Sequence, residues 1–270
     1  MTTAMRRSDG QSATTGTAWD GLFAELGAWA DAGRTATLWW RDDDAVAATP
    51  ALEKLLLLRR RIGVPLALAV IPRRVDASLA SRLSSEIEIS VLQHGYSHDN
   101  FAGPGDHKIE LDGSRPTDYV IADLATGMQI MAAMPGWLPV LVPPWNRIAP
   151  HLLPMLPELG YCGISTLGAR DRRLAVGRLV RHNVHIDPVD WRGRNGPAGG
   201  FAGAAPVLAA LTTHLRDRRE GRVDDAEASG IMTHHKVQDS ATWEFFAQLL
   251  ERTAAHPAVR WCAAPEMFAP

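Results

Sequence analysis

The sequence predicts an α/β protein that folds into a distorted (β/α) barrel of about seven parallel strands. From residue 35 onward, short apolar runs alternate with helical patterns, as in chains where each strand is followed by a crossover helix. Residues 64–71 are almost continuously apolar, which is typical of a strand that is buried on both faces of a parallel sheet. About seven strand–helix pairs in 270 residues fit one barrel better than two separate domains.

Eight short apolar segments are the expected strands: 35–41, 64–71, 87–92, 138–142, 161–166, 179–186, 230–233 and 259–262. Six amphipathic segments are the expected helices: 50–61, 76–84, 116–133, 149–159, 207–219 and 242–254. The first of these helices has the clearest ends, since Thr49 is a favourable N-cap, Pro50 suits the first position and Gly63 ends it. Two stretches rich in Gly and Pro, 103–112 and 193–205, predict loops inserted into the barrel.

Composition excludes several classes of protein. The hydrophobic fraction of 46% and the charged fraction of 21% are ordinary for a globular chain, which excludes wholesale disorder and collagen. The net charge of −2 gives no reason to expect nucleic acid or an anionic membrane as a partner. Cys162 and Cys262 are too few for a disulfide framework and are expected to be small buried apolar residues.

Residues 1–16 are polar and rich in Ser and Thr, and they predict a disordered tail before a single domain at 17–270. No apolar run follows Arg6 and Arg7 as a secretory signal would require, so a cytoplasmic location is expected. No stretch approaches the ~18 consecutive apolar residues that a membrane span needs. The pattern predicts no oligomeric state.

Titratable, polar and aromatic residues follow five of the expected strands. They are Asp42, Asp43 and Asp44; His94 and His98; residues 143–146; Asp187, Asp190 and Trp191; and His234 and His235. In a (β/α) barrel, functional residues gather at the carboxyl ends of the strands, so these groups are expected to share one rim.

Two of these groups predict a metal site. His94 and His98 are four residues apart, a spacing that lets both imidazoles of a helical turn bind one metal. With one carboxylate they form a three-ligand site with open positions, typical of catalytic Zn²⁺ and also of the non-haem iron facial triad. Three adjacent acids repel one another when buried, so we expect a metal to neutralise one and Arg41 another. The third acid is then a candidate general base, and His234 a candidate general acid.

In this order, the motifs resemble those of the polysaccharide deacetylases, the NodB-homology group of carbohydrate esterase family four. The resemblance runs from about residue 38 to residue 250. RDDDA looks like the aspartate-pair motif of that family, and HGYSH looks like its two-histidine metal motif. VPPWN resembles the proline-rich motif that lines the active-site groove of the family. DPVDW is similar to the Asp-x-x-Asp-Trp motif, and IMTHH to the closing hydrophobic–His motif.

The resemblance implies a metal-dependent hydrolase that removes an N-acetyl group from an amino sugar or polysaccharide. It assigns Asp43 as general base and His234 as general acid, with one divalent metal, expected to be Zn²⁺. It implies Asp44, His94 and His98 as the metal ligands. In the alternative register, Asp42 is the base and Asp43 the ligand. Residues implied in binding the N-acetylated carbohydrate are Pro144, Trp145, Asp187, Asp190, Trp191 and His235.

Two positions depart from the family pattern. Gly95 stands where the family usually has Ser or Thr after the first metal histidine, and Val142 stands where an Arg orients the catalytic Asp. We expect Arg41 to be the substitute for that Arg, with Arg147 as the next candidate. Two other functions stay open: hydrolysis of a non-sugar C–N bond on the same fold, and carbohydrate binding with little or no turnover.

Overall fold

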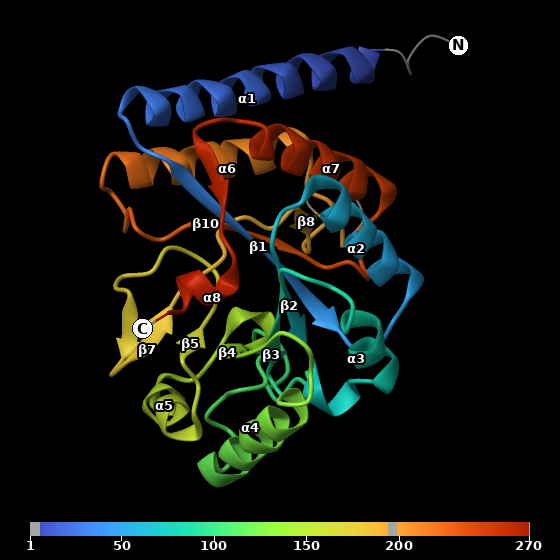
Figure 1. Ribbon diagram of the computed structural model, residues 1–270, viewed down its shortest axis with the longest axis vertical. Coiled ribbons are helices and arrows are strands. Elements are labelled where there is room, and N and C mark those ends of the chain that lie inside the picture. Colours follow the sequence, from blue (N-terminus) through green and yellow to red (C-terminus); the bar gives the residue numbers. More distant parts are fainter. Residues whose placement is uncertain (1–5, 194–198, 270) are drawn as a thin grey trace.

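The computed structural model describes residues 6–193 and 199–269, and it is built around one mostly parallel sheet (Figure 1). The strands lie in the order β10-β1-β2-β3-β4-β5-β7-β6, and β11 pairs with β1. Their bounds are β1 Ala36–Ala45, β2 Leu66–Val70, β3 Ile89–His94, β4 Trp137–Val142, β5 Gly163–Ile164, β6 Leu174–Val176, β7 Leu179–Arg181, β10 Ser229–Thr233 and β11 Val259–Trp261. From β10 to β7 every neighbouring pair is parallel, which gives the seven parallel strands that the sequence predicts.

The segment after β7 brings the two ends of this strand order together. The backbone N–H groups of His185 and Ile186 donate to the carbonyl of Gly230 in β10, at 2.8 and 3.1 Å. The N–H of Met232 donates in return to the carbonyl of Ile186 at 2.8 Å. The chain therefore returns to β10 at the far end of the sheet, as the predicted distorted barrel requires.

The helices cover the outside of this sheet. They are α1 Arg6–Asp31, α2 Pro50–Ile62, α3 Ala77–Leu83, α4 Thr117–Met131, α5 Leu156–Leu159, α6 Ala204–Arg219, α7 Ser240–Ala254 and α8 Ala264–Met267. The caps of α2 are those expected: the Thr49 side chain accepts a hydrogen bond from Leu52 N at 3.2 Å, and Gly63 ends the helix at φ 76°. None of the helices in the described ranges is long and apolar enough to cross a membrane.

Helix α1 is the largest difference from the sequence prediction. It begins at Arg6, within the segment predicted to be a disordered tail, and continues to Asp31. Four of its apolar side chains are buried: Trp19, Leu22, Leu26 and Trp29. They are spaced so that they lie on one face, which packs along α6 (Figure 1). Four glycines within α1 lower its intrinsic helix propensity, and burial of this face overrides that weakness.

Removing one of these side chains is expected to destabilise the whole domain. Trp29 is 1% exposed, and its Nε1 donates to the carbonyl of Leu215 in α6 at 3.3 Å. Trp29→Ala is expected to lower the free energy of unfolding by about 3–5 kcal/mol in urea denaturation. Asp20→Ala, at an exposed position of the same helix, should change it by less than about 0.5 kcal/mol. If Trp29→Ala lowers the free energy of unfolding as little as Asp20→Ala does, α1 is not part of the cooperative unit.

Other elements are shorter or more broken than the sequence predicts. The expected helix at 149–159 is a 3₁₀ helix, η3 (Pro150–Met155), followed by α5, because Pro154 and Pro157 interrupt regular α-helical hydrogen bonding. The expected strand at 179–186 is β7 alone, with the segment after it bonded to neighbours by single bridges. The predicted loop at 193–205 contains β9 (Gly200–Phe201), which pairs with β8 (Val189–Asp190) just before the loop to form a small hairpin. Residues 194–198 lie outside the described ranges.

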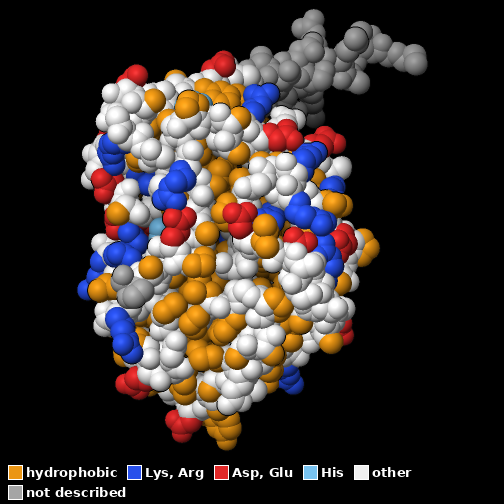
Figure 2. All heavy atoms as spheres, in the orientation of Figure 1, with side chains coloured by type: hydrophobic (Ala, Val, Ile, Leu, Met, Phe, Trp, Pro, Cys, Tyr) orange, Lys and Arg blue, Asp and Glu red, His pale blue; other side chains and the backbone are white. Residues whose placement is uncertain are grey.

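The cysteines and the surface agree with the composition. Both cysteines are free; Cys262 is buried and Cys162 is partly buried. On the face shown in Figure 2, side chains of both charge signs are interspersed with apolar ones.

Candidate metal centre and its surroundings

Strand β1 carries all three acids inside the strand. The prediction that they follow the strand was wrong, because β1 continues to Ala45. Its pairing with β2 is regular at Asp42 and shifts before Ala45, and Asp44 has a φ of 75°. Such irregularities redirect side chains and are common beside active sites. As a result the three neighbouring carboxyl groups face three different environments.

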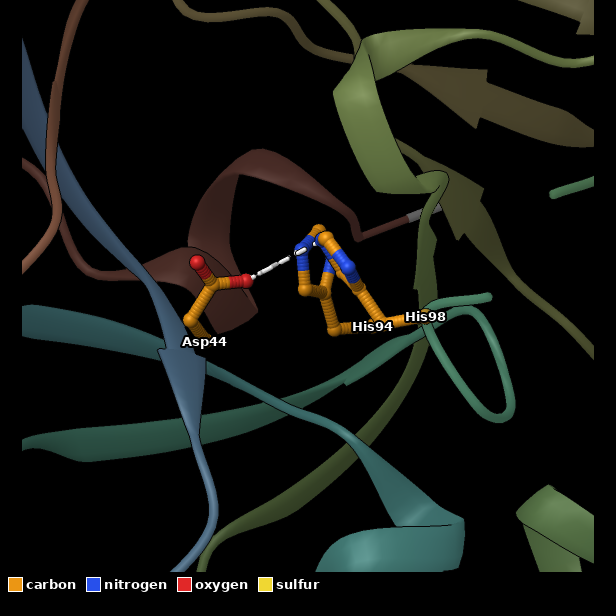
Figure 3. Close-up of side chains that lie close together, drawn as sticks. All are labelled: Asp44, His94 and His98. Atoms are coloured by element: carbon orange, nitrogen blue, oxygen red, sulfur yellow. Dashed lines mark ion pairs between the residues drawn. The ribbon is translucent and has the colours of Figure 1, made fainter. Parts of the chain in front are cut away.

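Asp44 points toward the two histidines of HGYSH (Figure 3). Its Oδ1 lies 3.1 Å from Nε2 of His94 and 3.3 Å from Nε2 of His98. His94 ends β3, and His98 lies in the following turn with a φ of 58°. One ligand atom from each of the three residues lies within 4.8 Å of the others, so they can hold one metal ion as the sequence predicts.

The surroundings of this triad suit a metal. Nδ1 of His94 is 2.9 Å from the carbonyl of Val142; donation of its proton there leaves Nε2 free to act as a ligand. The Oδ1 atom of Asp44 is buried and has no hydrogen bond of its own within the described residues. The ring of Trp145 packs on the ring of His98 at 4.4 Å between centroids and shields one side of the triad. Two imidazoles and one carboxylate form a donor set that fits Zn²⁺.

Electrostatics favour the protonation states that metal binding needs at two of the three positions. Burial acts to raise the pKa of Asp44, but contact with His94 and the nearby charge of His98 outweigh it and lower the pKa. Burial and the charge of His94 lower the pKa of His98 to about 4. Burial acts to lower the pKa of His94, yet its contact with Asp44 raises it overall, so this imidazole must give up a proton to a metal.

Asp43 is held by Arg41, two residues earlier on the same strand. Nε and Nη2 of Arg41 donate to the two carboxylate oxygens of Asp43, each at 2.9 Å, and both residues are buried. Arg41 also donates to Oγ of Ser165 at 2.7 Å and to Oδ1 of Asn146 at 2.7 Å. The guanidinium predicted to replace the missing Arg at position 142 is therefore in contact with Asp43. Arg147 donates instead to the carbonyl of Lys108, at 3.0 Å.

The Asp42 carboxyl group contacts neither the two histidines of HGYSH nor Arg41 in the described residues; its partners are Thr233 and His235. It accepts hydrogen bonds from Oγ1 of Thr233 at 2.6 Å and from the backbone N of His235 at 3.0 Å, and it contacts Nδ1 of His235. This position favours the register in which Asp44, and not Asp43, is the ligand. The prediction that His235 binds the carbohydrate is not supported, because its side chain is 1% exposed and faces Asp42.

Two further predicted residues, Trp191 and Asp187, lie near His234. The ring of His234 packs edge-on against Trp191 at 4.9 Å, and Nε1 of Trp191 donates to Oδ2 of Asp187 at 2.7 Å. Burial raises the pKa of Asp187, and the charge of His234 opposes this effect. Asp190 is buried and accepts from the backbone N of Arg192 at 3.2 Å, so it helps to hold the β8–β9 hairpin.

The proline-rich motif forms a short 3₁₀ helix, η2 (Pro144–Asn146), beside the metal ligands. Pro144 is buried, while Trp145 is partly exposed, with a φ of 53°. Trp145 is therefore accessible to a ligand, whereas Pro144 is not.

Sequence reasoning missed three polar residues of the site: Asn146, Ser165 and Glu110. Ser165 lies directly after β5, and a search of every strand end for hydroxyl groups could have found it. Asn146 was within a recognised motif but had no assigned role. Glu110 lies in a stretch interpreted as a loop, and no local pattern distinguishes it from a surface acid.

The comparisons with known proteins agree with the fold. No family model and no curated protein matches the chain. A candidate polysaccharide deacetylase from Mycobacterium smegmatis superimposes with a TM-score of 0.63 at 18% identity, over 87% of this chain and 90% of that one. A peptidoglycan N-acetylglucosamine deacetylase in complex with an N-hydroxybenzamide gives 0.55 at 14% identity, over 87% and 88% of the two chains.

Two further structures widen the range of activities on this fold. A family 4 carbohydrate esterase from Streptomyces lividans, in complex with acetate, superimposes with a TM-score of 0.52 at 14% identity, over 86% and 94% of the two chains. A mutant of a family 4 pseudoenzyme gives 0.51 at 12% identity, over 87% and 68%. Together with the sheet order, these likenesses show that the chain has the NodB-type α/β fold of the polysaccharide deacetylases and family 4 carbohydrate esterases.

Proposed function

We propose that this protein is a metal-dependent hydrolase that removes an N-acetyl group from an amino sugar or polysaccharide. The observation that carries the proposal is the convergence of Asp44, His94 and His98 beside a separately held carboxylate, Asp43. The fold supports it, and so does the resemblance of RDDDA and HGYSH to motifs of the polysaccharide deacetylases.

The triad would hold the metal through Oδ1 of Asp44 and the Nε2 atoms of His94 and His98. A bound divalent cation such as Zn²⁺ polarises an acyl carbonyl and lowers the pKa of water in its open position. Asp43 follows as the general base. Its oxygens each accept one bond from Arg41, and a carboxylate oxygen has a second lone pair with which to accept the proton of a water.

His234 is the proposed general acid for the leaving amine. It is 8% exposed, its Nδ1 is buried and has no hydrogen-bond partner in the described part of the chain, and Trp191 fixes the plane of its ring. Asp187 is linked to this ring through Trp191, whose Nε1 donates to Oδ2 of Asp187 at 2.7 Å. The proposed base lies in β1 and the proposed acid directly follows β10, and these two strands are neighbours in the sheet.

The substrate class is inferred from the aromatic side chains at the rim. Trp191, beside His234, is 48% exposed. Trp145 of the proline-rich motif, beside His98, is partly exposed. Indole faces pack well against the apolar C–H face of a sugar ring, because both surfaces are flat and weakly polar. An N-acetylated carbohydrate is accordingly the proposed substrate, and a non-sugar amide is the alternative.

A carbohydrate-binding protein without turnover is the second candidate, since Val142 replaces the family Arg and a pseudoenzyme has the same fold. The buried contact between Arg41 and Asp43 weakens this candidate, because it supplies a guanidinium to the proposed base. All five residues of the proposed metal and acid–base chemistry are also present.

The metal assignment predicts that the protein binds one divalent ion per chain and that His98→Ala loses most of it. Removing one of three protein ligands leaves too few donors to retain the ion through purification. Elemental analysis checks the content. His214→Ala removes a partly buried histidine of α6 and should leave the content unchanged. Equal metal in wild type and His98→Ala would refute the assignment.

The same preparations test the reaction itself. Acetate release from N-acetylated oligosaccharides, with none from N-acyl amides that lack a sugar, supports the proposed substrate class. Release only from the non-sugar amides would favour the alternative hydrolase. A metal-loaded protein that binds oligosaccharides but releases no acetate from any compound would favour the binding protein.

A further inference from the structure

The turn that carries both histidine ligands folds around a buried carboxyl group, Glu110. Gly95 and His98 have positive φ angles of 56° and 58°, so the backbone between them curls inward. Within this curl the backbone N–H groups of Tyr96 and Ser97 are directed to one acceptor. That acceptor comes from a segment twelve residues beyond His98.

Glu110 is 1% exposed, and within the described residues its carboxyl group accepts hydrogen bonds from this turn alone. Its Oε1 accepts from N of Ser97 at 2.7 Å, from Oγ of Ser97 at 3.0 Å and from N of Tyr96 at 3.2 Å. Its Oε2 is 3.3 Å from N of Tyr96. Glu110 forms no ion pair with a Lys, Arg or His in the described residues, so its hydrogen bonds serve only the turn.

The side chain at position 95 is limited by the same carboxyl group. A Cβ on residue 95 would overlap Oε2 of Glu110 and would lie 2.6 Å from Cγ and Cδ of Pro144. Glycine is therefore required on steric grounds as well as for its φ. Where the related motif has a hydroxyl next to the first histidine, this chain has a carboxyl group from another segment in the same space.

Glu110 is itself fixed by its neighbours. Leu111 is 1% exposed, forms a parallel bridge with Ile148 and accepts a hydrogen bond from Ala149 N at 2.7 Å. On the other side, Ile109 accepts from Phe101 N at 2.9 Å through its carbonyl. The backbone on both sides of Glu110 is therefore hydrogen-bonded to other segments. The fixed carboxyl group can in turn hold the His94–His98 turn in one conformation.

We propose that Glu110 is a positioning residue of the metal centre: it fixes the turn between His94 and His98 and thereby keeps both Nε2 atoms directed at one point. Gly95 and Glu110 act as a matched pair, because the glycine provides the space that the carboxyl group fills. The negative charge of Glu110 also adds to the field that attracts a cation. This inference rests on the proposed function, since it assumes that the triad binds a divalent metal.

The test is the Zn²⁺ affinity of Glu110→Gln, measured on metal-free protein by competition with a chromophoric chelator. Glutamine keeps the shape but removes the charge and places an NH₂ group against Gly95 or the Tyr96 N–H. We expect the affinity to fall by about 10- to 100-fold, the usual cost of losing a group that supports metal ligands. Glu227→Gln is the matched control. Glu227 is also 1% exposed and accepts from two backbone N–H groups, those of Arg170 and Asn183, away from the triad.

The two variants separate positioning from general stability. Both should lower the melting temperature of the metal-free protein, but only Glu110→Gln should weaken Zn²⁺ binding. Where Glu110→Gln fails to fold, Ser97→Ala replaces it, because that change removes only the 3.0 Å hydroxyl contact and should weaken binding a few-fold. Zn²⁺ affinities of Glu110→Gln and wild type within about twofold would overturn the proposal. A wild-type protein that binds no Zn²⁺ would instead overturn the proposed function.

Discussion

Replacing Asp43 with asparagine is expected to lower kcat/KM by about 10²- to 10⁴-fold and to leave the bound metal in place, since general bases contribute in this range. Asparagine has the same shape but cannot take a proton from water at neutral pH. The metal ligands are unaffected, because the Asp43 carboxyl group faces Arg41 and not the histidines. Initial rates of acetate release and elemental analysis of the same samples check both parts.

The neighbouring acids supply the controls for this prediction. Asp44→Asn should weaken metal binding, because its Oδ1 is the atom that meets both histidines. Asp42→Asn should mainly lower stability, because its hydrogen bonds are to Thr233 and His235 in a buried cluster. If Asp43→Asn strips the metal while Asp42→Asn stops turnover with the metal bound, the base and ligand are one position earlier than proposed.

Most of the barrel could be predicted because each strand leaves a local signal. Apart from one proline each, the runs at 64–71 and 138–142 are apolar, which is typical of parallel strands buried on both faces. The cap residues Thr49 and Gly63 fixed the ends of α2 in the same way. Helix α1 gave no such signal, since its glycines weaken the local preference and its stability comes from α6, almost two hundred residues away.

The residues of the site also fall into those that local sequence motifs predict and those that only the folded chain identifies. The triad could be predicted because its ligands lie in compact motifs at strand ends, and the structure brings Asp44, His94 and His98 together. The different surroundings of Asp42 and Asp44 depend on the irregular pairing of β1 with β2, which sequence spacing does not reveal. Glu110 and Ser165 reach the site from segments with no motif, so only the folded chain identifies them.

Arg41→Met is expected to have the second large effect, on stability and turnover together. The side chain is fully buried, and its loss leaves the Asp43 carboxylate without a counter-ion, which typically costs about 3–5 kcal/mol. Turnover should fall mainly in kcat, because the base loses the two bonds that orient it while the metal and the aromatic rim remain. Urea denaturation and steady-state kinetics on the metal-loaded variant measure the two effects.

Arg147→Met tests the other candidate for the same role. Within the described residues the Arg147 side chain donates to the Lys108 carbonyl and contacts no site residue, so its loss should change stability by less than about 0.5 kcal/mol and leave kcat unchanged. A fall in kcat for Arg147→Met with none for Arg41→Met would reverse the assignment of the orienting residue.

A double-mutant cycle separates the loss of the ion pair from the loss of packing. In Arg41→Met combined with Asp43→Asn, no uncompensated charge stays buried, because both members of the pair are removed. The double variant should therefore be more stable than Arg41→Met alone, although it carries one change more. Residues in direct contact give such non-additive free energies, whereas separated residues give additive ones. Additive losses would mean that Arg41 stabilises the protein through Ser165 and Asn146, and that Asp43 is oriented by another group.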